Sequence, residues 1–261
     1  MSNERSDSAS GGVQSVDRAV TVLEILARRG EAGVTEVAAD IGVHKSTAFR
    51  LLGALEEREL VEQTQDRGKY RLGFGVLRLA AAVPGRLEVT QQGHQICEQL
   101  AADVGETVNV AVLRSRFVVN VDQALGPSAV GAHNWIGELT PLHATSSGKI
   151  LLAFMPADER RALVRSTDLT RFTDRTLTTY AELDAQLKAV LRDGYVTTHA
   201  ELEDGLNAVA APIRDHLGDV IAALSVSGPA YRFDDERMTA VVPDVVAAAE
   251  KISGRMGFHS P

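Results

Sequence analysis

The chain has 261 residues, enough for one large domain or two ordinary ones. Of these residues 44% are apolar and 24% are charged, which is the composition of a globular protein. No long apolar run or signal-like start is present and Cys97 is the single cysteine, so we expect a cytoplasmic protein without a membrane span, secretory leader, disulfide framework or cysteine-rich zinc site. The net charge of −8, from 27 basic and 35 acidic side chains, by itself argues against a protein whose main task is to hold nucleic acid.

The first part of the chain has the pattern of a small helical domain with a hairpin. Residues 1–12 contain nothing to bury, and we expect a disordered tail there. Apolar residues then recur at helical spacing, and Thr35 is a suitable cap for the second helix. Helices are predicted at 13–27, 35–41 and 45–57, followed by a β-hairpin of 60–63 and 69–73.

Two short helices joined at Gly42 predict a helix-turn-helix, because the second of them is apolar on one face and polar on the other. Its polar face would enter the major groove of DNA, where Arg50 is able to bond guanine with two hydrogen bonds. Hydroxyl and N–H groups at the helix start suit a phosphate, and a basic hairpin suits a wing along the phosphate backbone. The alternative is a small helical domain whose surface merely carries these residues. The predicted DNA-binding residues are Lys45, Ser46, Thr47, Arg50, Arg67, Lys69 and Arg71.

The pattern changes near Pro84-Gly85, which follows a predicted helix at 74–82 and marks a domain boundary. Helices are predicted at 89–104, 148–154, 157–165, 180–193 and 234–256, and strands at 107–113, 117–123, 195–198, 207–213 and 219–227. This order of helices and neighbouring strands indicates an α+β domain built on an antiparallel sheet.

Motifs along nearly the whole chain resemble those of the IclR family of bacterial transcription regulators. The first half carries VQSVDRA at 13–19, VHKSTAFRLL at 43–52 and KYRLG at 69–73. The second half carries LHATSSGK at 142–149, AVAAPI at 208–213 and ALSVSGP at 223–229. The resemblance implies a winged helix-turn-helix at 13–73, a linker helix at 74–88 and a GAF-like effector-binding and oligomerisation domain at 89–261. It also implies dimers that pair into tetramers.

A ligand site is predicted where small polar side chains meet a helix start. Ser146 and Ser147 precede a helix whose first N–H groups, with that of Gly148, can hold a carboxylate, although an ordinary N-cap explains Ser146 equally well. Ser225 and Ser227 share one strand face, which is either a pocket wall or solvated. The resemblance points to the same helix start and strand, and Trp135 is either a cover for the ligand or a packing residue. The candidate effector-binding residues are Ser146, Ser147, Gly148, His199, Glu201, Ala208, Ser225 and Ser227.

Two other functions are alternatives for the second half. Ser146 and Lys149 match the Ser-x-x-Lys pattern of a hydrolase, in which the lysine activates the serine, but the partner motifs of such enzymes are missing. The seven histidines have no metal-binding spacing, so we expect neither an enzyme nor a cofactor. A dimerisation module without a ligand is the other alternative.

The sequence is therefore interpreted as a cytoplasmic, ligand-responsive regulator that binds a palindromic double-stranded operator as a dimer or dimer of dimers and does not bind membranes. Repression relieved by a small polar or carboxylate metabolite is expected, with activation as the alternative. Basic residues gather on the predicted recognition helix and wing, whereas Glu56, Glu57, Glu59 and Glu62 lie between them. The net charge thus predicts few phosphate contacts per monomer and modest non-specific affinity, not the absence of DNA binding.

Overall fold

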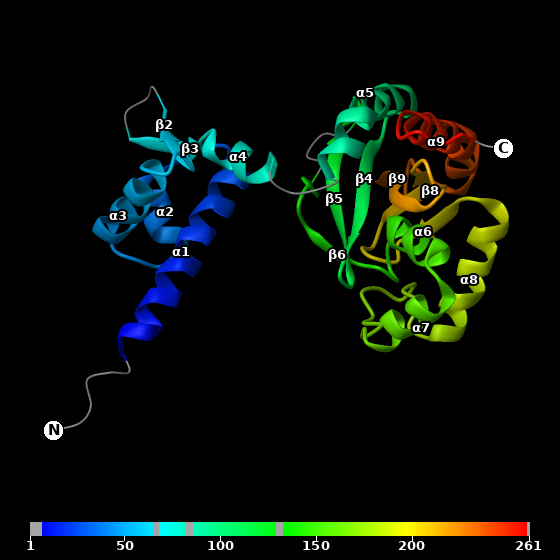
Figure 1. Cartoon of the computed structure of the whole chain (residues 1–261), viewed down its shortest axis with the longest axis horizontal. Helices are drawn as coiled ribbons and strands as arrows, with labels where there is room; N and C mark the ends of the chain where they lie inside the picture. The colour runs from blue at the N-terminus through cyan, green and yellow to red at the C-terminus, as the bar shows by residue number, and fades with distance from the viewer. Residues whose placement is uncertain (1–6, 65–67, 82–85, 129–132, 260–261) are drawn as a thin grey trace. The chain divides into compact units, whose positions relative to one another are not determined.

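The computed structural model describes residues 7–64, 68–81, 86–128 and 133–259 (Figure 1). The chain divides into two compact units, Met1–Pro84 and Gly85–Pro261, at the Pro84-Gly85 position where the sequence pattern changes. No helix in these described ranges is long and apolar enough to cross a membrane.

The N-terminal unit is a helix-turn-helix with a small sheet. Its elements are α1 (Asp7–Arg29), β1 (Ala32–Gly33), α2 (Val34–Asp40), α3 (Lys45–Glu56), β2 (Val61–Gln63), β3 (Lys69–Leu72) and α4 (Gly75–Ala81). The antiparallel sheet has the order β1-β3-β2, so the hairpin is joined by a third strand. Leu26 of α1, Leu52 of α3 and Tyr70 of β3 meet in one core, which fixes α3 against α1 and leaves its opposite face outside.

Three details of this unit differ from the sequence prediction. Residues 7–12, predicted as tail, are the first turns of α1, because the buried stripe that reveals a helix in the sequence begins only later, in the part of α1 that packs on the core. Strand β1 is missing from the prediction, since two residues are too few to show a period. The cap of α2 is Gly33 and not Thr35: the Gly33 N–H donates to the Glu36 carboxylate over 2.7 Å.

The C-terminal unit is an α+β domain with one antiparallel sheet. Its strands are β4 (Thr107–Arg114), β5 (Phe117–Ala124), β6 (Leu139–Pro141), β7 (Val196–His199), β8 (Leu206–Arg214) and β9 (Val220–Pro229), in the order β6-β5-β4-β9-β8-β7. Its helices are α5 (Arg86–Val104), α6 (Ser146–Phe154), α7 (Ala157–Arg165), α8 (Tyr180–Asp193) and α9 (Asp235–Arg255). The sequence predicts all of these elements except β6, which has only three residues. Helix α4 ends at Ala81 and α5 begins at Arg86, and the residues between them lie outside the described part of the predicted linker helix.

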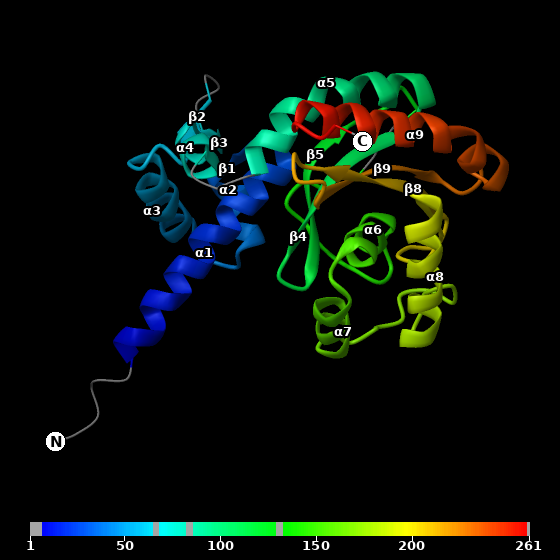
Figure 2. The same ribbon diagram turned by 45° about the vertical axis from the view of Figure 1, so that its right-hand side comes forward.

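Helices cover both faces of this sheet (Figure 2). Helices α5 and α9 lie on one face, and α6, α7 and α8 lie on the other. Side-chain alternation divides β9 between two cores: Leu224 and Val226 pack toward α5 and α9, and Ala223 packs toward α6. The α6 face of β9 also carries Ser225 and Ser227, which lie beyond the part of the strand that packs in the second core.

Close packing holds the start of α6 against the preceding loop. A Cβ atom on Gly148 would lie 2.3 Å from the carbonyl oxygen of Leu142, so only glycine fits there. The cap of α6 is Thr145, whose hydroxyl oxygen accepts a hydrogen bond from the Gly148 N–H over 3.1 Å. These two contacts place the first turn of α6 at the open part of the sheet face.

Candidate DNA-binding surface and ligand cavity

Helix α3 presents a polar face to the outside of the N-terminal unit. Ala48, Leu52 and Leu55 bury one side of the helix, whereas Lys45 and Arg50 are exposed on the other. In the described part of this unit, ion pairs involve Arg29, Lys69, Arg71 and Arg78 but neither Lys45 nor Arg50. Both side chains are therefore available to a groove or a phosphate, as predicted for a recognition helix.

The start of α3 is less available to a phosphate than the sequence suggests. His44 is the N-cap, and its Nδ1 atom accepts from the Ser46 N–H over 3.4 Å and lies 2.9 Å from the Ser46 hydroxyl oxygen. The Thr47 N–H donates to the His44 carbonyl oxygen over 2.9 Å, and the Thr47 side chain is half-buried. A phosphate would have to replace the bond from the Ser46 N–H to the His44 ring, and the phosphate contacts of Ser46 and Thr47 stay a prediction.

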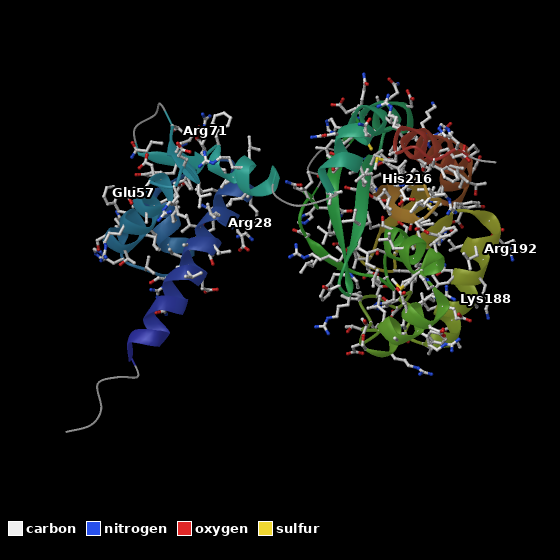
Figure 3. The ribbon with its side chains drawn as sticks, in the orientation of Figure 1. Arg28, Glu57, Arg71, Lys188, Arg192 and His216 are labelled. Atoms are coloured by element: carbon white, nitrogen blue, oxygen red, sulfur yellow. The ribbon has the colours of Figure 1, made fainter. Side chains whose placement is uncertain are left out.

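The basic residues of the wing have carboxylate partners within the unit. Lys69 Nζ lies 2.5 Å from Glu31, and the Arg71 guanidinium lies 2.7 Å from Glu62. Figure 3 labels Arg71 on the hairpin and Glu57 directly after α3. Arg67, also predicted to bind DNA, lies outside the described residues. Exposed pairs of this kind stabilise a fold by only about 0–1 kcal/mol, so a DNA phosphate can replace either carboxylate at small cost.

A cavity of about 530 Å³, including its open mouth, lies in the C-terminal unit beside the first turn of α6. The sheet contributes a row of side chains to its wall, because Thr198 of β7 is paired with Ala208 of β8, and Ala208 with Ser227 of β9. Ser225 extends the row along β9. The alanine leaves space above the sheet, so hydroxyl groups surround the opening.

Six of the eight predicted effector residues line this cavity. They are Ser146, Ser147, Glu201, Ala208, Ser225 and Ser227. Gly148 is not among the lining residues, because it packs on Leu142 and its N–H is bonded to Thr145. His199 is also outside: it follows Thr198 in β7, and its ring Nε2 lies 2.8 Å from Asp235. Alternation along β7 explains this result, since one of two successive residues must point away from the cavity.

Several lining residues are absent from the sequence prediction. Asn109 of β4 and Asn120 of β5 add side-chain amides to the wall, and Thr140, Thr145 and Thr198 add hydroxyls. Trp135 also lines the cavity, which agrees with one of its two predicted roles. Asn109 has a signal in the sequence, since it is a polar residue inside the otherwise apolar run of β4. The other residues come from separate loops and strands that no local pattern connects.

A buried ion pair holds Glu201, one of the residues that line the cavity. Lys149 is 0% exposed and donates from Nζ to both carboxylate oxygens of Glu201, the first over 2.5 Å. Burial lowers the pKa of Lys149 below its ordinary value, while the Glu201 carboxylate acts in the opposite direction. The amine that a Ser-x-x-Lys mechanism needs as a base is therefore held by Glu201.

Comparison with known proteins supplies the family. Residues 15–65 match the IclR helix-turn-helix domain, and residues 81–254 match the bacterial transcriptional regulator IclR C-terminal domain. The transcriptional repressor AllR of Klebsiella pneumoniae is 32% identical over 256 residues, which are 98% of this chain and 94% of AllR.

Solved structures agree with this result. The IclR structure from Thermotoga maritima has a TM-score of 0.78 and 27% identity, and the match covers 94% of this chain and 100% of that one. An IclR homologue from Microbacterium hydrocarbonoxydans, complexed with 4-hydroxybenzoate, has a TM-score of 0.73 and 28% identity, with 94% and 98% of the two chains covered. These relatives do not support the hydrolase alternative. The chain belongs to the IclR family of bacterial transcriptional regulators, and it is a DNA-binding regulator with an effector domain.

Proposed function

We propose that this regulator is a cytoplasmic repressor that binds a palindromic operator as a homodimer or dimer of dimers, and that a small polar or carboxylate metabolite in the cavity weakens operator binding. One observation carries the proposal: the same chain has a helix-turn-helix whose α3 exposes Lys45 and Arg50 and, in a separate unit, a preformed cavity lined in part by hydroxyl and amide groups. The name of AllR supports repression, and the 4-hydroxybenzoate complex supports a small carboxylate ligand.

The cavity suits a small anion although no basic side chain is among its described lining residues. Among the described residues that line it there is no lysine, arginine or histidine, and the charge of Glu201 is neutralised by Lys149. Ser146 and Ser147 are the first two residues of α6, so their N–H groups have no acceptor within the helix. These N–H groups lie at the positive end of the helix dipole. A carboxylate at this point would receive N–H and hydroxyl hydrogen bonds, which are short and strong when the acceptor is charged.

Exposed apolar side chains support self-association of the N-terminal unit. Val16 is 64% exposed and Val20 is also exposed on α1, while Phe74, Leu77 and Leu79 are exposed at α4. A second copy of the chain would cover such side chains and would present two α3 helices to successive half-sites, about 34 Å apart or a multiple of this spacing. A palindromic operator follows from the two-fold symmetry of the protein pair.

The ligand changes operator affinity only if it binds the DNA-competent state and the other state unequally. A double substitution, Ser225→Ala with Ser227→Ala, tests the site. We expect the variant to bind the operator like the wild type but to remain bound when lactate, glycerate or 4-hydroxybenzoate releases the wild type. Ser166→Ala is the control, because Ser166 ends α7 and bonds only to its own helix turn. Release of the double variant at wild-type ligand concentrations would reject the cavity as the effector site.

A further inference from the structure

Phe49 is a large apolar side chain on the outer face of α3. It is 58% exposed, and among the residues of α3, all of which the structure describes, it is the single exposed large apolar residue. Helix α3 contributes Ala48, Leu52 and Leu55 to the core of the N-terminal unit, and Phe49 is not among the described residues of that core. The packing of the unit therefore gives no reason for a phenyl ring at this position.

Helical geometry places Phe49 on the same outer surface as the predicted DNA-binding residues of α3. Residues three and four apart are neighbours on a helix, so Lys45 and Ser46 lie one turn before Phe49. Arg50 is the next residue along the helix. Long side chains of a helix lean toward its N-terminal end, so the ring is directed toward the turn of Lys45 and Ser46. This first part of a recognition helix is the part that contacts base edges in the major groove.

The charges around the ring favour a negatively charged partner. Lys45 and Arg50 lie on either side of Phe49 in the helix, both are exposed, and neither is in an ion pair in the described part of the unit. A protein that covered the ring would also have to remove water from these two cations, which is costly without acceptors for them. Phosphates and guanine supply such acceptors. The surface around Phe49 therefore suits DNA better than a second copy of the chain.

Gly53 keeps the surface beside the ring free of side-chain atoms. It lies one turn after Phe49, in the interior of α3, where glycine destabilises a helix relative to alanine. A Cβ atom at this position would meet no described atom within 4 Å outside its own helix. The packing of the unit therefore does not require glycine at 53, whereas a close approach of DNA to this face of α3 explains it.

We propose that Phe49 reads a thymine in each operator half-site by packing its ring against the C5-methyl group of the base. Among the four bases only thymine presents a methyl group in the major groove, and phenylalanine is one of the side chains that contact it. The contact removes apolar surface of both partners from water. The inference rests on the operator binding of the proposed function, since it names a residue that reads the operator, but it needs no ligand in the cavity.

The experiment removes one methyl group of the DNA at a time. A duplex that the full chain selects from a random pool serves as the probe, and each thymine of a half-site is replaced in turn by deoxyuridine, which pairs in the same way but lacks the methyl group. At one thymine per half-site, we expect the wild type to lose about fourfold in affinity, the effect of one buried methyl-sized group. Phe49→Ala should bind the unmodified probe at least about fourfold more weakly and show no further loss at that position.

Two further variants complete the comparison. Leu217→Ala is the control: Leu217 is 74% exposed and lies between β8 and β9 in the other unit, so this variant should keep both the wild-type affinity and the loss at deoxyuridine. Phe49→Leu keeps an apolar side chain on α3 and should recover part of the loss at deoxyuridine that Phe49→Ala lacks. Urea unfolding should be the same for every variant, because the replaced side chains are exposed.

The outcomes separate this inference from the proposed function. An equal loss at deoxyuridine in the wild type and in Phe49→Ala, or no sensitive thymine in the selected sequence, would overturn the assignment of Phe49 alone. A change of oligomeric state in Phe49→Ala, with binding weakened equally on both kinds of DNA, would also overturn it and would place the ring between two copies of the chain. Selection of no preferred sequence would contradict operator binding and this inference together. Failure of every acid to release the probe would contradict only the proposed effector response.

Discussion

Ion pairs occur in both units, but they differ in their surroundings. In the N-terminal unit, Arg71 and Glu62 form an exposed pair on the wing, and Arg50 on α3 is exposed without such a partner among the described residues. In the C-terminal unit, Lys149 and Glu201 are buried beside the cavity. Water and salt screen the exposed pair, so another anion can replace its carboxylate, whereas separating the buried pair leaves a charge in a nonpolar environment. The first arrangement suits exchange with DNA phosphates, and the second suits a fixed cavity wall.

The largest effect is expected from breaking the buried pair. Lys149→Met leaves the Glu201 carboxylate without its partner, which should lower the free energy of unfolding of the C-terminal unit by about 3–5 kcal/mol. Urea unfolding followed by Trp135 fluorescence measures this, because Trp135 is the single tryptophan of the sequence and lines the cavity. Combining Lys149→Met with Glu201→Gln should recover most of the loss. A double variant as unstable as the single one would show that the charge is not the cause.

The next effect is expected on DNA recognition. Arg50→Ala should weaken operator binding by about 1–3 kcal/mol and relax specificity if the side chain reads a base. The free energy of unfolding should be the same as that of the wild type, since Arg50 is exposed. Arg192→Ala is the matched control, because Arg192 is an exposed arginine of α8 paired with Asp193 (Figure 3). Competition binding with operator and scrambled DNA measures both quantities, and unchanged affinity and specificity would remove Arg50 from the recognition surface.

The free energy of unfolding should depend on pH through a buried histidine of the C-terminal unit, His143. Burial lowers the pKa of His143 below its ordinary value of 6.5, and its Nε2–H donates to the Thr170 carbonyl oxygen over 2.9 Å. The folded state therefore binds fewer protons than the unfolded state, so this contribution is complete above pH 6.5 and is lost as the pH falls. His143→Gln should reduce the slope of unfolding free energy below pH 6.5, by at most about 1.4 kcal/mol per pH unit. An identical slope in the variant would argue against a neutral buried histidine.

The smallest effect is expected from the wing. Arg71→Ala should remove one predicted phosphate contact, so affinity should fall by a similar factor on every DNA sequence and the slope of log K against log salt should decrease by about 1 per site. Glu62→Gln frees Arg71 from its carboxylate and should raise non-specific affinity. If both variants keep the wild-type salt slope, the hairpin does not contact phosphate.

The sequence predicts the fold well where a period is visible. Apolar spacing locates α1, α2 and α3, and alternation in β9 separates the core residues from Ser225 and Ser227. Two short strands, β1 and β6, are missing from the sequence prediction because two or three residues are too few to show a period. The serine pair lies near the predicted helix start, but α6 begins at Ser146 and not at Gly148, and its cap is Thr145 and not Ser146.

Contacts between distant residues cannot be predicted in this way. Lys69 and Glu31 are 38 positions apart, and Lys149 and Glu201 are 52 apart, so neither pair has a local signal. His199 is misplaced for a different reason: the residue type suits a ligand site, but strand alternation turns Thr198 inward instead. The use of the Ser46 and Thr47 N–H groups by His44 likewise depends on the geometry of the cap.

Coupling between the two sites is the central claim, and reciprocal binding measures it most directly. The affinity of a small carboxylate that releases the operator is measured by calorimetry for the full chain alone and for the full chain saturated with operator. If the acid weakens operator binding, thermodynamic linkage requires that the operator weaken binding of the acid by the same factor. We therefore predict equal factors in the two directions for the wild type and no coupling for the double variant Ser225→Ala with Ser227→Ala. Acid binding that is the same with and without operator would contradict ligand-controlled DNA binding.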